Sequence, residues 1–191
     1  VEIIAIAWKI LSLCGLENDT TLNLNSIGSN ECRNNYRTAL KDYLYPYIKD
    51  FSKTSQHRFD TNPLRILDTK SEKEQEILND APKISDYHNK TDSTHFESLK
   101  EFLKDIGLPF CINHKLVRGL DYYTGTVFEF NSDNLGAQDA LLGGGRYNRL
   151  VETLGGKPTP GIGFAAGIER FLMAMEQSNF DAKRSNPDVY F

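Results

Sequence analysis

Alternating hydrophobic and polar positions mark several short stretches of the chain, and each stretch predicts a β-strand. In residues 20–27 the leucines face one way and the asparagines the other, as in a half-buried strand. Four further candidates lie in the second half of the chain, at residues 109–116, 124–130, 139–145 and 160–167. Because short glycine-bearing turns join them, they favour an antiparallel sheet over a doubly wound one.

Apolar residues spaced three and four positions apart predict helices around these strands. The first covers residues 1–14 and ends at a glycine. A second, longer helix begins at about Asn30 and carries apolar positions as far as Phe51. A third covers residues 91–108, and a short one is expected around residues 146–154.

The stretch from about Lys53 to Leu108 has a different sequence pattern, with short helical segments broken by prolines and by runs of charged residues. Prolines end helices because they lack an amide hydrogen and restrict the residue before them. We therefore expect a small helical subdomain inserted into the sheet. The predicted fold class is α+β, an antiparallel sheet with flanking helices plus this insertion.

Composition narrows the function classes. The chain has 191 residues, which can bury a proper core, and its net charge of -4 argues against a nonspecific nucleic-acid coat, although a local basic patch can bind a particular RNA. The three cysteines and four histidines lack disulfide or metal-ligand spacing, so we expect reduced thiols and no metal site. With neither a secretory signal nor an apolar run of membrane-spanning length, the sequence predicts a cytoplasmic protein. It begins inside an amphipathic pattern without an initiator Met, which is typical of a fragment.

Arg118 stands where a predicted turn leads into the strand at 124–130, beside Tyr122 and Tyr123. A guanidinium in that position can grip a planar anion through its fixed donor fork. It can equally pair with Asp121 and pin the turn. This stretch alone leans toward the structural interpretation.

Glycines mark two further candidate sites. Residues 143–145 place three glycines between an apolar strand and a helix, where they serve either a tight turn or the close approach of another group. Gly161 and Gly163 lie within a predicted strand, which suggests that something flat packs against that face. Arg170 lies in the first turn of a helix that follows Gly167, where the helix dipole disfavours a cation. A bound polyphosphate, a stacked base or a structural carboxylate would each offset that cost.

Basic residues on the second helix, Arg33, Arg37 and Lys41, lie four positions apart and form a ridge. Such a ridge is either a phosphate contact or, more often, a solvated helix face. The sequence has no Walker A motif and no Rossmann fingerprint. Two arginines at strand ends and glycine-bearing sheet residues instead suggest a nucleotide lying on an antiparallel sheet.

These residues together carry a family resemblance. The stretch LVRGLDYYTGTVFEF, residues 116–130, resembles the histidine-specific signature of histidyl-tRNA synthetases. The match continues through GGGRYNRLVETLGG to PGIGFAAGIER, residues 160–170, which is similar to class II motif 3. The earlier NSIGS and TNPLRILD also resemble that family, so the resemblance covers nearly the whole chain.

The resemblance implies a role for each matching residue. Arg118 would be the catalytic arginine that bridges the histidine carboxylate and the ATP α-phosphate, where related synthetases use a metal ion. Tyr122 and Tyr123 would line the histidine pocket, with Gly144 in the backbone at its floor. The implied ATP-binding residues are Arg118, Gly161, Gly163, Gly167 and Arg170, and Arg33, Arg37 and Lys41 are the candidates for tRNA contact.

The resemblance also divides the chain into three segments. Residues 1–44 would be the first part of the catalytic core, and residues 45–113 the helical insertion that approaches the tRNA acceptor stem. Residues 114–191 would be the second part of the core, with the histidine signature and motif 3. Motifs 1 and 2 would precede this chain and an anticodon-binding domain would follow it, so we expect residues 1–191 to be inactive alone.

The implied function is ATP-dependent activation of histidine and its transfer to tRNA(His), which yields histidyl-tRNA, AMP and pyrophosphate. ATP would enter with Mg²⁺ as a substrate complex, without a tightly bound cofactor, and the full-length enzyme would be a homodimer without membrane contact. Two other interpretations share parts of the pattern: a noncatalytic histidine sensor resembling the ATP phosphoribosyltransferase regulatory subunit, and a tRNA-binding module. The helical insertion argues against the sensor. The intact residues Arg118, Tyr122, Tyr123 and Arg170 argue against the module.

Overall fold

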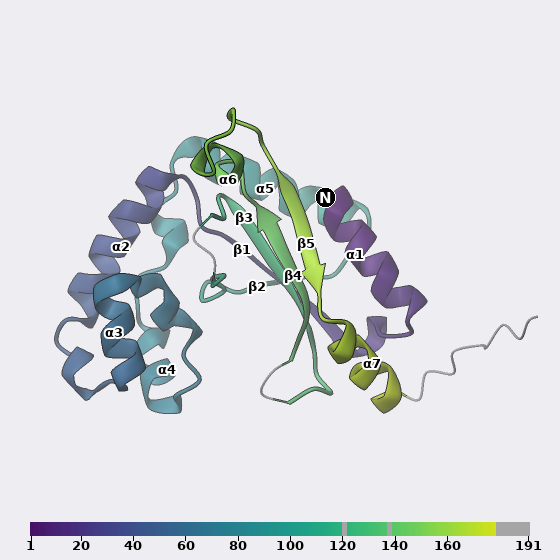
Figure 1. The fold of residues 1–191 in the computed structure, drawn as a ribbon, viewed down its shortest axis with the longest axis horizontal. Coiled ribbons are helices and arrows are strands. Elements are labelled where there is room, and N and C mark those ends of the chain that lie inside the picture. The colour runs from purple at the N-terminus through teal and green to yellow at the C-terminus, as the bar shows by residue number, and fades with distance from the viewer. Residues whose placement is uncertain (120–121, 137–138, 179–191) are drawn as a thin grey trace, which may run out of the picture.

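The computed structural model describes residues 1–119, 122–136 and 139–178. Its centre is a five-stranded sheet with helices on both faces (Figure 1), which confirms the predicted fold class. In chain order the strands are β1 (Thr20–Ser26), β2 (Cys111–Ile112), β3 (Thr126–Ser132), β4 (Ala140–Arg146) and β5 (Ile162–Ala166). The α-helices are α1 (Glu2–Leu13), α2 (Asn30–Leu44), α3 (Lys53–Thr61), α4 (Glu72–Asn79), α5 (Lys90–Asp105), α6 (Leu150–Thr153) and α7 (Ile168–Gln177).

The strand order is β2-β1-β3-β4-β5. The pairs β1–β3, β3–β4 and β4–β5 are antiparallel, as predicted, but β2 pairs with β1 in parallel. The chain leaves the sheet after β1 and returns beside it only at Cys111. A parallel pair needs such a long crossover connection, so the wholly antiparallel sheet predicted from short turns was wrong at this edge.

Several predicted boundaries also differ from the structure. The second helix ends at Leu44 rather than reaching Phe51, because Pro46 has no amide hydrogen with which to continue the helical hydrogen bonds. The strand predicted at residues 109–116 pairs over two residues only. The three glycines at 143–145 lie inside β4, which confirms the strand predicted at residues 139–145, and the alternative of a tight turn before a helix is wrong.

One face of the sheet is apolar. Leu24 of β1, Phe128 and Phe130 of β3 and Leu142 of β4 are buried against α1 and α5. The ring of Trp8, on α1, stacks on Phe130 with centroids 6.0 Å apart. At about 25 cal/mol per Å² of buried apolar area, this face supplies a large part of the stabilisation of the core.

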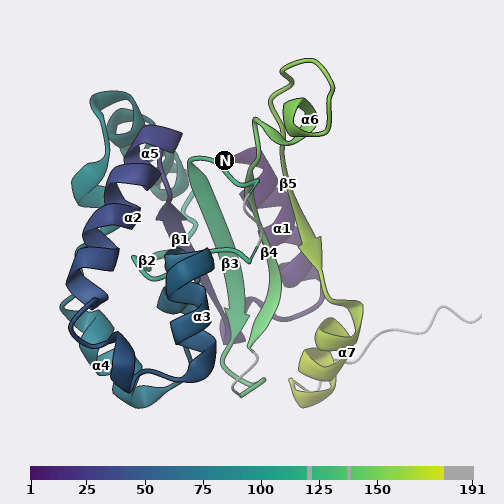
Figure 2. The same ribbon diagram turned by 60° about the vertical axis from the view of Figure 1, so that its left-hand side comes forward.

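A helical lobe covers the other face of the sheet (Figure 2). It is built by α2, α3 and α4 with the short turns between them, and its apolar side chains form a second cluster that includes Leu116, Tyr123 and Val127. By contrast, Phe96, Leu99 and other buried residues of α5 belong to the cluster on the apolar face. Each cluster therefore draws on both sides of residue 45, and the proposed three-segment division of the chain remains a prediction.

Glu74 organises the lobe from within. Its carboxylate is buried, with 2% of the residue exposed, and accepts hydrogen bonds from Ser52 N (2.7 Å), Ser55 Oγ (2.7 Å) and Thr69 Oγ1 (2.5 Å). Burial alone would raise the pKa of Glu74, but these hydrogen bonds outweigh it and the pKa is lowered. The carboxylate thus joins α4 to the start of α3 and to the segment between them.

Candidate active site

The face of the sheet opposite the apolar core carries polar side chains in register. Asn23 of β1 pairs with Glu129 of β3, and Glu129 pairs with Gly143 of β4. Side chains alternate between the two faces of a strand, so these three positions share one face. Asn131, two residues further along β3, lies on the same face. Helical-lobe segments and the stretch before β3 border this row.

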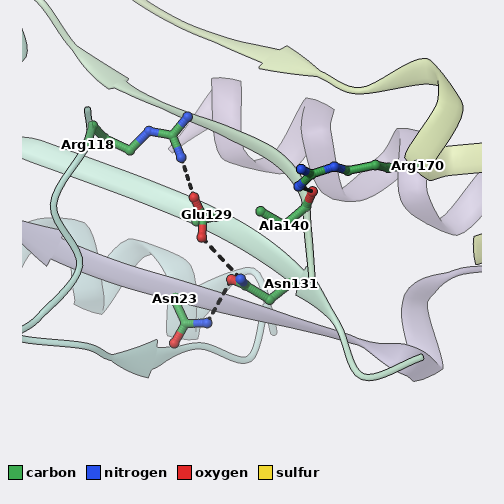
Figure 3. A network of polar contacts seen from close by, with 6 residues as sticks. All are labelled: Asn23, Arg118, Glu129, Asn131, Ala140 and Arg170. Atoms are coloured by element: carbon green, nitrogen blue, oxygen red, sulfur yellow. Dashed lines mark hydrogen bonds and ion pairs between the residues drawn. The ribbon is translucent and has the colours of Figure 1, made fainter. Parts of the chain in front are cut away.

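Arg118 reaches this row from the segment that leads into β3. Its Nη1 donates to Glu129 Oε2 in an ion pair whose side chains are only 25% and 19% exposed. The other carboxylate oxygen, Oε1, accepts from Asn131 Nδ2 at 3.1 Å. Asn131 Oδ1 in turn accepts from Asn23 Nδ2 at 3.0 Å, and Figure 3 shows the whole chain of contacts. The alternative partner Asp121 lies outside the described residues.

The guanidinium rests directly on the backbone of β4. A Cβ on Gly143 would lie 2.7 Å from Arg118 Cζ and closer still to Nη1, so any side chain there would displace the arginine. Gly145 faces the same way, because its Cβ would lie 2.9 Å from Tyr123 Cδ1. Gly144 faces the apolar side, where a Cβ would lie 2.7 Å from Phe164 Cα.

Three tyrosine rings lie together beside Arg118. The centroids of Tyr122 and Tyr123 are 4.7 Å apart, and Tyr147 contacts them edge-on at 6.0 and 6.4 Å. Tyr123 is 6% exposed. Burial raises the pKa of Tyr123, a hydrogen bond with Tyr122 raises it further, and Arg118 opposes the shift. The Tyr123 hydroxyl is therefore neutral at physiological pH.

The basic residues of α2 differ in their surroundings. Arg33 Nη1 donates to the Tyr123 carbonyl at 2.9 Å and Nη2 to Asn30 Oδ1, so Arg33 supports the tyrosine pair. The Lys41 Nζ lies 5.2 Å from the centroid of the Phe59 ring. Arg37 is exposed. The three side chains thus form neither a uniform ridge nor a fully solvated face, and their contact with tRNA stays a prediction.

The predicted nucleotide residues lie around β5. The ring of Tyr147 fills the space that a Cβ on Gly161 would occupy, and its hydroxyl lies 3.0 Å from the Cβ position of Gly163. The flat group predicted from these paired glycines is therefore a side chain of this protein. Gly167 is the N-cap of α7. Arg170 Nη1 donates to the Ala140 carbonyl, at the start of β4, at 2.8 Å.

A polar cleft of about 450 Å³ opens at Arg118 between the sheet and the helical lobe. Its volume is within the range of small-molecule sites. Charged side chains of both signs line it, and Arg118 is the one predicted site residue among them. Its lining includes Asp68, Lys70, Lys115, Arg118, Glu129 and Asp139.

Sequence reasoning missed four residues of this site: Asn23, Glu129, Asn131 and Tyr147. A signal was present in the alternation itself, because TTLNLNS and TVFEFNS each carry polar residues at every second position. Two neighbouring strands with that pattern predict a polar sheet face.

Within the part of the chain that the structure describes, no three His, Cys, Asp or Glu side chains are grouped to hold a metal ion. Across the same residues no helix is long and apolar enough to cross a lipid bilayer.

Comparison with known proteins places this chain in a class. The family model described as Histidyl-tRNA synthetase matches residues 1–171, so the fold is that of an aminoacyl-tRNA synthetase. Because the match spans most of the sequence, the chain belongs to the histidyl-tRNA synthetase family.

Curated relatives agree. The chain is 49% identical to a histidine–tRNA ligase of Anaplasma phagocytophilum (strain HZ) over 177 residues, which cover 93% of this chain and 42% of the relative. It is 48% identical to the ligase of Cyanothece sp. over 189 residues, 99% of this chain and 44% of the relative. The chain thus spans less than half the length of these relatives.

Solved structures show the same fold. A structure of apo histidyl-tRNA synthetase from S. aureus matches with a TM-score of 0.73 and 39% identity, covering 95% of this chain and 44% of that one. A structure from Bacillus halodurans C, titled as an ATP phosphoribosyltransferase regulatory subunit/histidyl-tRNA synthetase, matches with a TM-score of 0.58 and 23% identity, covering 91% of this chain and 48% of that one. At that identity the second likeness concerns the fold alone.

Proposed function

We propose that this chain is part of the catalytic domain of a class II histidine–tRNA ligase. The enzyme activates histidine with ATP, which enters as a Mg²⁺ complex, and transfers it to the acceptor stem of tRNA(His). Histidyl-tRNA, AMP and pyrophosphate are the products. Support comes from the family membership and from the curated relatives named as this ligase. We also propose that the full-length enzyme is a cytoplasmic homodimer.

One observation carries the proposal: Arg118, the arginine of the histidine signature, lines a polar cleft large enough for small ligands. In the proposed reaction the histidine carboxylate attacks the α-phosphorus of ATP in line, and negative charge builds on the phosphoryl oxygens. A fixed guanidinium stabilises that charge in the transition state. The protein then contributes geometry and electrostatics more than covalent chemistry.

The tyrosine cluster supports a histidine pocket beside Arg118. A neutral, buried Tyr123 hydroxyl offers a hydrogen bond that can orient a ligand, and the stacked ring of Tyr122 adds an apolar wall. We assign these two residues to histidine and Gly143 to Gly145 to the pocket floor. Gly161, Gly163, Gly167 and Arg170 are assigned to ATP by their match to motif 3.

The test is performed on the full-length protein that carries these residues. We expect histidine-dependent exchange between ATP and pyrophosphate and charging of tRNA(His). A histidine sensor would bind histidine without exchange, and an RNA-binding module would bind the acceptor stem without either reaction; each result would refute the proposal. Residues 1–191 alone span under half of the relatives, and we expect no exchange from them.

A further inference from the structure

The ion pair of Arg118 uses one end of the guanidinium. Nη1 donates to Glu129. Gly143 forms the surface beneath the guanidinium. The arginine is therefore held between a carboxylate and a bare stretch of backbone. A planar fork with one terminal nitrogen engaged keeps donors for other anions.

Glu129 is itself held in one orientation. Its two oxygens have different partners, since Oε2 accepts from Arg118 and Oε1 accepts from Asn131 at 3.1 Å. The Asn131 amide is fixed in turn by Asn23 at 3.0 Å. All of these side chains except Arg118 project from paired strands at the centre of the sheet (Figure 3). Groups on rigid strands hold their geometry better than groups on loops.

We propose that Glu129 is a positioning residue, which acts through Arg118, and that Asn131 and Asn23 hold Glu129 in place. The inference rests on the proposed function, because it assigns the arginine to the reaction. Arg118 comes from a segment outside the strands and has a long, flexible side chain. The hydrogen bonds from Asn23 through Asn131 to Glu129 give that side chain one orientation before substrates arrive. The side chain therefore loses less conformational freedom when the transition state forms.

A competing interpretation makes Glu129 a placeholder whose carboxylate occupies the arginine until a substrate anion displaces it. The two interpretations predict opposite effects. Removing a placeholder strengthens substrate binding and lowers KM. Removing a positioning residue lowers kcat more than it weakens substrate binding, because the interaction that weakens is strongest in the transition state.

The experiment measures histidine-dependent pyrophosphate exchange by full-length Glu129→Gln. Glutamine keeps the size of the side chain but has a single acceptor oxygen, so it cannot serve Arg118 and Asn131 together. We expect kcat to fall by about tenfold to a hundredfold, as when a hydrogen bond to a charged group is lost, with both KM values within about threefold of wild type. Asn131→Ala should lower kcat by about tenfold and Asn23→Ala by about threefold, because each acts one step further from the arginine.

Two controls separate positioning from general damage. Glu101→Gln and Asn35→Ala change exposed residues on α5 and α2 and should leave kcat at the wild-type value. In an Arg118→Lys background, which keeps the charge but removes the fork, Glu129→Gln should lower kcat by less than about threefold, since it acts through the arginine.

Three results would overturn the inference: a lower KM with unchanged kcat, effects that multiply fully in the Arg118→Lys background, or lower thermal stability with unchanged kcat. Absence of exchange in the wild-type protein would instead refute the proposed function. An active wild type with an equally active Glu129→Gln variant would refute the positioning role alone.

Discussion

The two faces of the sheet are built from the same strands and differ in what each can tolerate. On the apolar face, leucines and phenylalanines pack against α1 and α5. On the polar face, Arg118 meets the bare backbone of Gly143. Successive residues of one strand belong to opposite faces. Gly143 and Gly144 are neighbours on β4 but serve different faces. Gly143 lies against the Arg118 side chain, and Gly144 allows β4 and β5 to lie in close contact.

The largest effect is expected from Arg118→Ala on the polar face. Losing a preorganised donor to developing charge costs about two to three decades in rate, so pyrophosphate exchange by the full-length protein should nearly disappear. The fold should persist, because the apolar face is untouched. Arg149→Ala, at the exposed N-cap position of α6, is the matched control and should retain exchange. Near-wild-type exchange by Arg118→Ala would remove the catalytic assignment.

The two glycines of β4 sharpen the contrast between the faces. In Gly143→Ala the new methyl group meets the far end of the Arg118 side chain, which can move aside. We expect a folded protein whose exchange rate falls by about a hundredfold, as for a catalytic group displaced by about 1 Å. In Gly144→Ala the methyl group meets the backbone of Gly163 and Phe164. That backbone cannot yield, and we expect a loss of about 2–3 kcal/mol in the free energy of unfolding.

Thermal unfolding and exchange kinetics measured on both variants decide this contrast. If Gly143→Ala loses as much stability as Gly144→Ala, the two faces are equally structural and the comparison fails.

A smaller effect is expected from Tyr123→Phe. The hydroxyl of Tyr123 has Tyr122 and Arg118 as neighbours, and its removal leaves the polar groups of a bound histidine without this hydrogen-bond partner. We expect the dissociation constant for histidine to rise by about tenfold, with less than a twofold change for ATP. Isothermal titration of each ligand measures this difference. Tyr45→Phe, on a side chain that is 73% exposed, should change neither value, and equal losses for both ligands would make Tyr123 structural.

The smallest effect is expected in the lobe that covers the polar face, where the buried carboxylate of Glu74 accepts hydrogen bonds from neighbouring segments. Glu74→Gln should cost about 1–2 kcal/mol of unfolding free energy at pH 7, because one acceptor replaces two. The pKa of Glu74 is lowered from 4.5 in the folded protein. Its contribution is therefore complete above that value and is lost as the pH falls through the folded pKa. Chemical denaturation across this range should show wild type and variant converging in acid.

Glu76→Gln, an exposed change on the same helix, provides the control for Glu74. A gap between wild type and Glu74→Gln that stays constant as the pH falls would contradict the assignment of charge to this carboxylate.

Local patterns predicted those parts of the fold that depend on local physics. The strand at residues 20–27 and the antiparallel strands of the second half followed from alternation, and the apolar spacing of residues 91–108 gave α5. The end of α2 at Leu44 was missed, although Pro46, which cannot donate a helical hydrogen bond, follows two residues later. The parallel pairing of strand β2 was also missed, because it depends on where a long excursion of the chain returns.

The arginine and the tyrosines of the candidate site were proposed from the sequence, whereas the residues that contact Arg118 and Glu129 were not. Glu129 alternates with phenylalanines, which is also the pattern of a strand with one solvated face. Its role becomes visible only once the helical lobe covers that face and Arg118 lies over it. The glycines at 143–145 were also compatible with a turn, because a sequence does not show which neighbouring group needs the space left by the absent side chain.

The hydrogen bond between Asn23 and Asn131 joins residues 108 positions apart. Contacts of such long range form late in folding, because the intervening chain must first be brought to closure. During synthesis, α1, β1 and the helical lobe leave the ribosome before β3 exists. The hydrogen bonds that orient Arg118 therefore cannot all form in the nascent chain until Asn131 has emerged from the ribosome.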